Sequence, residues 1–325
     1  AAPAAPPAGL LKACRLPACR RHADDAPRFY CAKHFDGSGH TLKNILMAVA
    51  IAQKNGMNFG GFVAGRGSKD MKMGGHDFYR LLDRFFGSPN ASVELRLETR
   101  RGEKLRFDYE PSSVRKLEDM AAARSLPRYA SVYMGDTHKW RYSYKSQRFS
   151  QYFAADLVSL LRRGVLSEPV DFAPNRLAAA FHVRRGDINP HGQYKTAIMK
   201  DSYYLDMVGH LRKVSPDVDI HVFSSTEPGT HHVWYSSDFD VYRRLGIHVH
   251  LDDPDLMTPW THFARAGVFV MSPSSFSWVP AVVNVNCVIF PGRGETSEWL
   301  DGLDSNRSSF DDELRQCIGR RPWLV

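Results

Sequence analysis

The sequence lacks a long apolar run. Its best candidate, residues 45 to 52, is far shorter than the roughly 20 apolar residues with which a helix crosses a bilayer. We therefore expect a membrane link only through an anchor outside this sequence. Long basic runs are also lacking, although the formal net charge is +8. The excess charge favours anionic partners, and we do not expect nucleic acid among them.

Cysteine is scarce, with five residues in 325. Cys14, Cys19 and Cys31 are followed by His34, an order with the ligand types and close pairs of a small zinc site. The cluster is a candidate structural zinc site, and a local disulfide or free thiols are the alternatives. Cys31 also falls within a predicted strand, which would fix its side chain on one face of a sheet. Residues 1 to 27 form an extension with an Ala/Pro-rich start, typical of a stem remnant or a processed end.

A length of 325 residues suits two α/β domains, which we place at residues 28 to 165 and 166 to 325. The N-terminal domain begins with a strand–turn–helix–strand pattern at residues 28–35, 36–40, 41–55 and 58–63. Further helices are expected at 77–86, 112–124 and 150–163, a polar hairpin at 92–97 and 104–109, and a strand at 129–134.

The C-terminal domain alternates regularly between strand and helix patterns. Strands are predicted at residues 177–183, 219–224, 247–251, 268–271 and 287–290, and helices at 201–214, 231–245, 255–266 and 275–283. Such alternation predicts a parallel, doubly wound sheet. Both domains are therefore expected to be Rossmann-like.

The first C-terminal strand leads directly into Arg184, Arg185, Gly186 and Asp187. Ligands of open α/β sheets bind at the carboxyl ends of strands, and two guanidinium groups there suit a diphosphate. Gly186 would allow close backbone approach, and Asp187 could orient one arginine. The alternative is a solvated basic pair, with the Arg-Gly-Asp order arising by chance; an adhesion role would need an exposed loop tip.

Two other strand ends carry small polar groups. One contains Ser224 and Ser225, and the other contains Ser274, Ser275 and Phe276 directly before a predicted helix. A serine that caps this helix would leave free amides and the positive dipole end directed at an anion. An ordinary capped helix is the alternative, but the neighbouring arginines favour a diphosphate site.

Three ordered segments then resemble a known family. His182-Val-Arg-Arg-Gly-Asp187, Val222-Phe-Ser-Ser225 and Ser274-Ser-Phe-Ser-Trp278 are similar to the motifs of the α1,2-fucosyltransferases, and more broadly of the superfamily with α1,6- and protein O-fucosyltransferases. The resemblance covers about residues 177 to 291. It implies a GT-B fold of two facing Rossmann-like domains with parallel sheets and a cleft between them. It also implies GDP-fucose as donor, inversion at the anomeric carbon and no required metal.

The resemblance also implies roles for individual residues. Arg185 matches the arginine that grips the β-phosphate of the donor, Arg184 matches its neighbour, and His182 matches a histidine near the nucleotide. Ser274 and Ser275 match serines on the phosphate side. The remaining expected donor contacts are Asp187, Ser224, Ser225 and Phe276, with Gly37 and Gly39 of the N-terminal turn.

The general base is not fixed by the motifs. Relatives place it in the N-terminal glycine turn, where Ser38 is a poor base, so Asp36 and His40 are our candidates alongside Arg185 as catalytic residues. The turn itself is short of a dinucleotide fingerprint and could be only a tight turn.

Two positions depart from the family pattern. Ile188 replaces an aromatic residue, and Pro259 stands where relatives have an acid for the guanine. Asp252, Asp253 or Asp255 would have to substitute, and a solvated turn is the alternative for these three acids. GDP as the nucleotide is therefore open.

We expect an inverting, metal-independent glycosyltransferase, a hexosyltransferase that moves fucose from GDP-fucose to a hydroxyl of a glycan or glycoprotein acceptor. The alternatives are a non-catalytic scaffold or subunit of a larger assembly and a transferase for another nucleotide sugar. Two sequons, Asn90-Ala-Ser92 and Asn306-Arg-Ser308, permit the expected location in the secretory lumen, in the Golgi.

Overall fold

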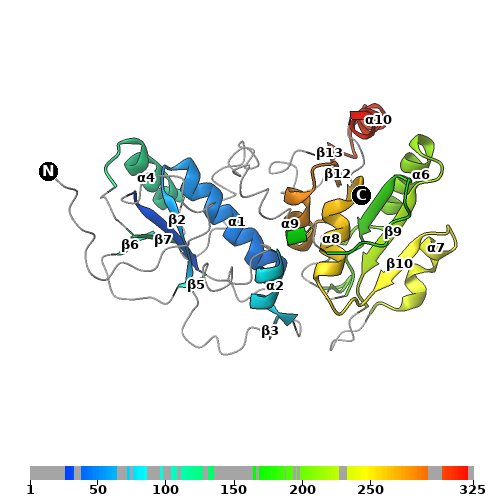
Figure 1. The fold of residues 1–325 in the computed structure, drawn as a ribbon, viewed down its shortest axis with the longest axis horizontal. Helices are drawn as coiled ribbons and strands as arrows, with labels where there is room; N and C mark the ends of the chain where they lie inside the picture. Colours follow the sequence, from blue (N-terminus) through cyan, green and yellow to red (C-terminus); the bar gives the residue numbers. More distant parts are fainter. Residues whose placement is uncertain are drawn as a thin grey trace. The chain divides into compact units, whose positions relative to one another are not determined.

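The computed structural model divides the chain into two compact units, Ala1–Arg163 and Gly164–Val325 (Figure 1). It describes residues 26–32, 38–63, 72–73, 76–85, 96–97, 104–107, 111–126, 131–134, 164–165, 168–186, 188–192, 195, 198–226, 233–291 and 302–320. Among the helices of these segments, none has the length and apolar character needed to span a bilayer.

The N-terminal unit contains a five-stranded parallel sheet in the order β5-β2-β1-β7-β6. Its elements are β1 (Arg28–Ala32), α1 (Ser38–Lys54), β2 (Asn58–Val63), β3 (Lys72–Met73), β4 (His76–Asp77), α2 (Phe78–Phe85), β5 (Arg96–Leu97), β6 (Lys104–Phe107), α4 (Pro111–Ala122) and β7 (Ser131–Met134). β3 and β4 form a separate antiparallel pair.

The predicted β1–α1–β2 unit is confirmed. Gly56, with a φ of +66°, ends α1 in the left-handed conformation that glycine adopts readily. The helix starts earlier than expected, at Ser38. β1 and β2 have a register irregularity between Phe29 and Tyr30, and a Cβ at Gly60 would lie 2.2 Å from the ring of Tyr30. Glycine there is required by the packed ring.

The predicted hairpin of residues 92–97 and 104–109 is wrong. β5 pairs with β2 and β6 pairs with β7, so the two strands lie at opposite edges of the sheet. In the backbone register, Leu97 is the partner of Val63, and Leu105 is the partner of the buried Val132. An isolated two-stranded hairpin is marginally stable at best, whereas a strand that adds to an existing sheet gains the support of the strands beside it.

The C-terminal unit contains a six-stranded parallel sheet in the order β10-β9-β8-β11-β12-β13. Its elements are β8 (Ala178–His182), α6 (Asp201–Val214), β9 (Asp219–Ser224), η5 (Ser236–Phe239), α7 (Asp240–Arg243), β10 (His248–Leu251), α8 (Met257–Arg265), β11 (Val268–Val270), α9 (Ser275–Val283), β12 (Cys287–Phe290), β13 (Leu303–Asp304) and α10 (Phe310–Arg320). All five predicted strands are confirmed, and β13 and α10 are additions.

Helices cover both faces of this sheet. α6, α7 and α10 pack on one face, where Phe181, Val222 and Ile289 belong to a buried apolar core with Tyr204 and Leu314 (Figure 1). α8 packs on the other face, where the ring of Phe263 lies 4.6 Å from that of Phe269 and 5.3 Å from that of Phe223. The predicted helix at 231–245 is much shorter in the structure, where the described part of that range, residues 233–245, contains only η5 and α7.

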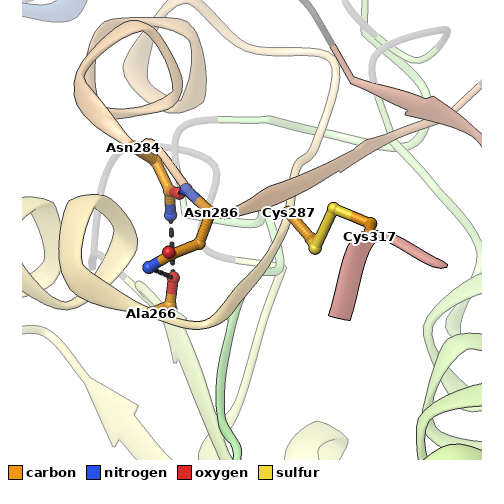
Figure 2. Close-up of a disulfide and its surroundings, with 5 residues drawn as sticks. All are labelled: Ala266, Asn284, Asn286, Cys287 and Cys317. Carbon is orange, nitrogen blue, oxygen red and sulfur yellow. Dashed lines mark hydrogen bonds between the residues drawn. A yellow bond between two sulfur atoms is a disulfide. The ribbon is translucent and has the colours of Figure 1, made fainter. Parts of the chain in front are cut away.

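The connection from α9 to β12 is fixed at both ends, as Figure 2 shows. Asn284 and Asn286 each donate a hydrogen bond of 3.1 Å to the carbonyl of Ala266, the residue after α8. Directly afterwards, Cys287 of β12 forms a disulfide with Cys317 of α10. The last helix is therefore tied covalently to the sheet.

Candidate functional site

The candidate site lies where the strand order of the C-terminal sheet reverses. From β8 the chain continues to the neighbouring β9 on one side, and it returns on the other side as β11. Loops that follow β8 and β11 therefore diverge, and such a switch point is where open α/β sheets bind ligands. The predicted arginine and serine segments follow β8, β9 and β11, so the fold brings them to one edge.

Arg185 is buried, with 5% of its surface exposed. Its Nη2 lies 2.7 Å from Oδ1 of Asp201, the first residue of α6, and its guanidinium carbon lies 4.7 Å from the ring centre of Trp234. Arg184 accepts a hydrogen bond of 3.0 Å from Arg185 through its carbonyl and is itself half-buried. The orienting carboxylate is thus that of Asp201, whereas Asp187 lies outside the described residues.

The loop after β8 needs glycine. Gly186 has a φ of +57°, and a Cβ there would lie 3.1 Å from Cβ of Ser225. Ser224 donates a hydrogen bond of 2.6 Å to the carbonyl of Val183. Ser224 therefore holds the end of β8 against β9 through its hydrogen bond, and Ser225 packs so close to Gly186 that a side chain there would crowd it.

His182 connects β8 to the start of α9. Its Nδ1 lies 2.8 Å from Oγ of Ser272 and 2.5 Å from Oγ of Ser277, and its ring lies 5.1 Å from that of Phe276. Burial lowers the pKa of His182 to about 3, with a further contribution from the two neighbouring arginines. The imidazole is therefore neutral, and it fixes the α9 terminus relative to the arginine loop.

The predicted helix cap is confirmed. Ser274 is the N-cap of α9, and its hydroxyl accepts a hydrogen bond of 3.2 Å from the amide of Phe276. Ser275, the first residue of the helix, is half-buried. The positive end of the α9 dipole accordingly points toward the edge that carries the arginines, an arrangement that suits an anion.

The three acids considered for binding the guanine base, Asp252, Asp253 and Asp255, accept hydrogen bonds from neighbouring loop residues. Asp252 accepts hydrogen bonds of 2.8 Å from the Ser225 hydroxyl and 2.7 Å from the Thr226 amide. Asp253 accepts one from the amide of Asp255, whose carboxylate accepts one from the amide of Met257. These contacts match the turn interpretation of the acids.

Several predicted site residues lie outside the described residues, namely Asp36, Gly37, Asp187, Cys14, Cys19 and His34. Gly39 and His40 lie in the first turn of α1, so they belong to a helix and not to a turn. Cys31 is buried in β1, and burial raises the pKa of its thiol to about 12. A protonated thiol is a poor metal ligand, and the zinc site stays a prediction.

Sequence reasoning missed three residues around Arg185. Asp201 and Trp234 contact its guanidinium, and the hydroxyl of Tyr242 donates to the same Asp201 oxygen at 2.7 Å. An acid in the first turn of a predicted helix after an arginine pair was a usable signal for Asp201. Trp234 and Tyr242 carried no comparable signal, because they come from distant segments.

No family model matches the chain, and no curated protein matches it. Among solved structures, the chain is similar to POFUT1 in complex with GDP-fucose, with 10% identity and a TM-score of 0.41 over 81% of this chain and 95% of that one. It is also similar to the dodecameric iron-containing heptosyltransferase TibC in complex with ADP-D-beta-D-heptose, with 12% identity and a TM-score of 0.41 over 92% of this chain and 74% of that one. Because both TM-scores lie below 0.5, we draw no functional conclusion from these similarities.

Proposed function

We propose that the protein is a glycosyltransferase that uses a nucleotide diphosphate sugar, with GDP-fucose as the donor. One observation carries the proposal. At the switch point of the parallel sheet, His182 joins the strand end that bears Arg184 and Arg185 to the Ser274-capped start of α9. Two kinds of anion-binding group are thereby held together on rigid elements.

The chemistry of transfer suits this arrangement. When the bond between the sugar C1 and the phosphate oxygen breaks, negative charge develops on the departing diphosphate. Fixed guanidinium groups and helix amides stabilise this charge without reorganising. Arg184, half-buried beside the loop, is our candidate for direct phosphate contact, and Arg185 both adds positive charge and holds the loop through Asp201.

The acceptor side rests on the family resemblance. We propose inversion, with a hydroxyl of a glycan or glycoprotein as nucleophile, and with Asp36 or His40 as the base that takes its proton. We further propose that transfer itself requires no metal. Fluorinated donor analogues and product anomer analysis by NMR would test the stereochemistry once an acceptor is found.

Calorimetric titration with GDP, UDP and GDP-fucose, each with and without EDTA, tests the donor. We expect GDP and GDP-fucose to bind equally well in both conditions, and UDP to bind much more weakly. A preference for UDP would replace the donor by another nucleotide sugar. Failure of all three to bind would refute the donor site.

A second candidate function is a fucosyltransferase-like scaffold or assembly subunit without turnover. It is favoured by the engagement of Arg185 with Asp201 and Trp234, and of Asp252 with Ser225 and Thr226. These contacts give the Arg185 guanidinium and the Asp252 carboxylate structural roles that need no ligand. Nucleotide binding without transfer to any member of a glycan and glycoprotein array would favour this candidate.

We propose the secretory lumen, in the Golgi, as the location. Asn306 of the second sequon lies on an exposed turn after β13, and the Cys287–Cys317 disulfide suits an oxidising compartment. Mass spectrometry of the protein from its native cells tests both features. An N-glycan on Asn306 is expected, and an unmodified Asn306 with reduced cysteines would contradict this location.

A further inference from the structure

A cluster of histidines and aspartates lies on the face of the C-terminal sheet that α8 covers. His221 of β9 is the register partner of His248 in β10, and His250 follows two residues later on the same face. Asp171 joins them from the segment that precedes β8, and its Oδ1 lies 3.9 Å from Nδ1 of His221. The cluster sits within the strands, whereas the donor site follows their carboxyl ends.

We propose that Asp171, His221 and His250 form a binding site for a divalent transition metal ion, with Zn²⁺ as the first ion to test. In the part of the chain that the structure describes, these residues are one of two groups with a ligand atom from each member within 4.8 Å of the others. Two imidazoles and a carboxylate are the ligand set that zinc and similar ions take, whereas Ca²⁺ and Mg²⁺ prefer oxygen alone.

The spacing of the ligand atoms suits a single ion. Nδ1 of His221 lies 2.9 Å from Nε2 of His250 and 3.9 Å from Oδ1 of Asp171. Ligands at the usual zinc distances, arranged tetrahedrally, lie about 3.3 Å from one another. These two separations lie on both sides of this value, and the third, between His250 and Asp171, is within 4.8 Å. Side-chain shifts of about an ångström would bring the three atoms into place.

His221 is oriented as metal-binding histidines are. Its Nε2 lies 3.1 Å from Oδ2 of Asp219, a buried carboxylate that also accepts a hydrogen bond of 2.6 Å from the amide of Ala173. Because an ionised carboxylate only accepts, His221 carries its proton on Nε2 and directs the Nδ1 lone pair into the cluster. A carboxylate behind a ligand histidine fixes its tautomer in this way.

Asp171 is held by a second histidine. Nδ1 of His262 donates a hydrogen bond of 2.7 Å to the carbonyl of Thr258 within α8. Its Nε2 accepts a hydrogen bond of 3.3 Å from the amide of Asp171 and also contacts Oδ1 of that residue. His262 is buried, whereas the side chain of Asp171 is 64% exposed. The backbone at Asp171 is therefore fixed beside the cluster, and the solvent can reach the site to deliver an ion.

The other group, Asp219, His221 and His248, is the weaker choice. Asp219 already accepts from Ala173 and His221, and the His248 side chain is 63% exposed and 3.5 Å from it. His248 thus provides a matched control within the same cluster. A metal at the proposed site would join β9 and β10 to the segment that leads into β8.

The test is titration of the chelator-treated full chain with ZnCl₂ in competition with a chromophoric chelator. We expect a strong site that is weakened at least tenfold by His221→Ala, His250→Ala or Asp171→Asn and is unchanged by His248→Ala. Asp219→Asn should weaken binding by 10 to 100-fold without removing a ligand. Circular dichroism and GDP titration of each variant show whether it is folded, independently of the metal.

The absorption spectrum of the chain with Co²⁺ bound in place of Zn²⁺ is a second test, and it needs no variant. Absorption typical of a four-coordinate cobalt site with nitrogen and oxygen ligands would support the proposal. Binding of Zn²⁺ no tighter than to an unrelated surface-histidine protein would overturn it. Loss of binding in His248→Ala together with full binding in Asp171→Asn would also overturn it, because the ligands would then be the other group.

Discussion

Oδ1 of Asp201 lies 2.7 Å from Nη2 of Arg185 and accepts a second hydrogen bond, also of 2.7 Å, from the hydroxyl of Tyr242. The Arg185 side chain is 4% exposed and that of Asp201 is 44% exposed, so water screens the pair only from one side. This pair joins the loop after β8 to the first turn of α6. Arg185 therefore has a structural role that the sequence motif does not reveal.

Alanine substitutions of Arg185 and Arg184 should differ in their effect on the free energy of unfolding. Arg185→Ala is expected to lower the free energy of unfolding by about 2 kcal/mol, below the usual cost of breaking a fully buried pair because Asp201 is partly exposed. Arg184→Ala should cost less than half of that and still weaken GDP binding at least tenfold. Urea unfolding and calorimetry measure the two effects. Equal stability losses in the two variants would contradict this division of roles.

The histidine of the site predicts a pH dependence of stability. Because burial lowers the pKa of His182 to about 3, from about 6.5 in the unfolded chain, the unfolded state binds more protons between these values. The stability that the neutral His182 contributes to the free energy of unfolding is fully present above pH 6.5 and is lost as the pH falls toward 3. The slope approaches 1.4 kcal/mol per pH unit in this range.

A His182→Gln variant is the comparison for that slope. Its free energy of unfolding should fall less steeply from pH 6.5 to 4 than that of the unsubstituted chain. The difference in slope should correspond to nearly one proton fewer taken up on unfolding. All other titrating groups are shared, so their contributions cancel in the difference. Parallel curves for the two proteins would mean that His182 is charged in the folded state.

Much of the C-terminal unit is predictable because its signals are local. The limits of β9, α6, α9 and β12 follow from apolar runs of strand or helix period, and Ser274 precedes α9 as a capping residue should. The α7 region was overpredicted, because helical composition at 231–245 does not reveal where a short helix begins. β13 is too short to leave a pattern.

Pairing across long sequence separations was not predictable. Nothing local distinguishes an edge strand from half of a hairpin, so β5 and β6 were paired wrongly. The same limit hid the contact of Arg185 with Trp234 and the approach of Asp171 to His221. Such contacts depend on how the helices and strands pack, which periodicity does not encode.

Two glycines should respond in opposite directions to alanine. Gly186→Ala should cost about 1 to 2 kcal/mol, because an L-residue resists the left-handed region, here with Ser225 3.1 Å from the new Cβ. Gly209 lies within α6 and has nothing within 4 Å of a new Cβ. Gly209→Ala should therefore stabilise by about 0.5 to 1 kcal/mol. Urea unfolding of both variants checks the signs, and destabilisation by Gly209→Ala would mean that α6 is packed differently.

The disulfide gives the last prediction. Cys287 and Cys317 are 30 residues apart and join β12 to α10, and sequence alone does not reveal such connectivity. A crosslink of this length restricts the unfolded chain and should contribute about 3 to 4 kcal/mol. The Cys287→Ser/Cys317→Ser double variant should lose that amount in urea unfolding.

Reduction of the unsubstituted chain is the matched control for the double variant. With the disulfide reduced, its unfolding midpoint should fall to that of the variant measured in the same reductant. The Leu314 side chain of α10 is buried in the core beside Phe310, so the helix should stay docked in the variant, with faster hydrogen exchange along α10. Undiminished stability after reduction would mean that packing alone holds α10 on the sheet.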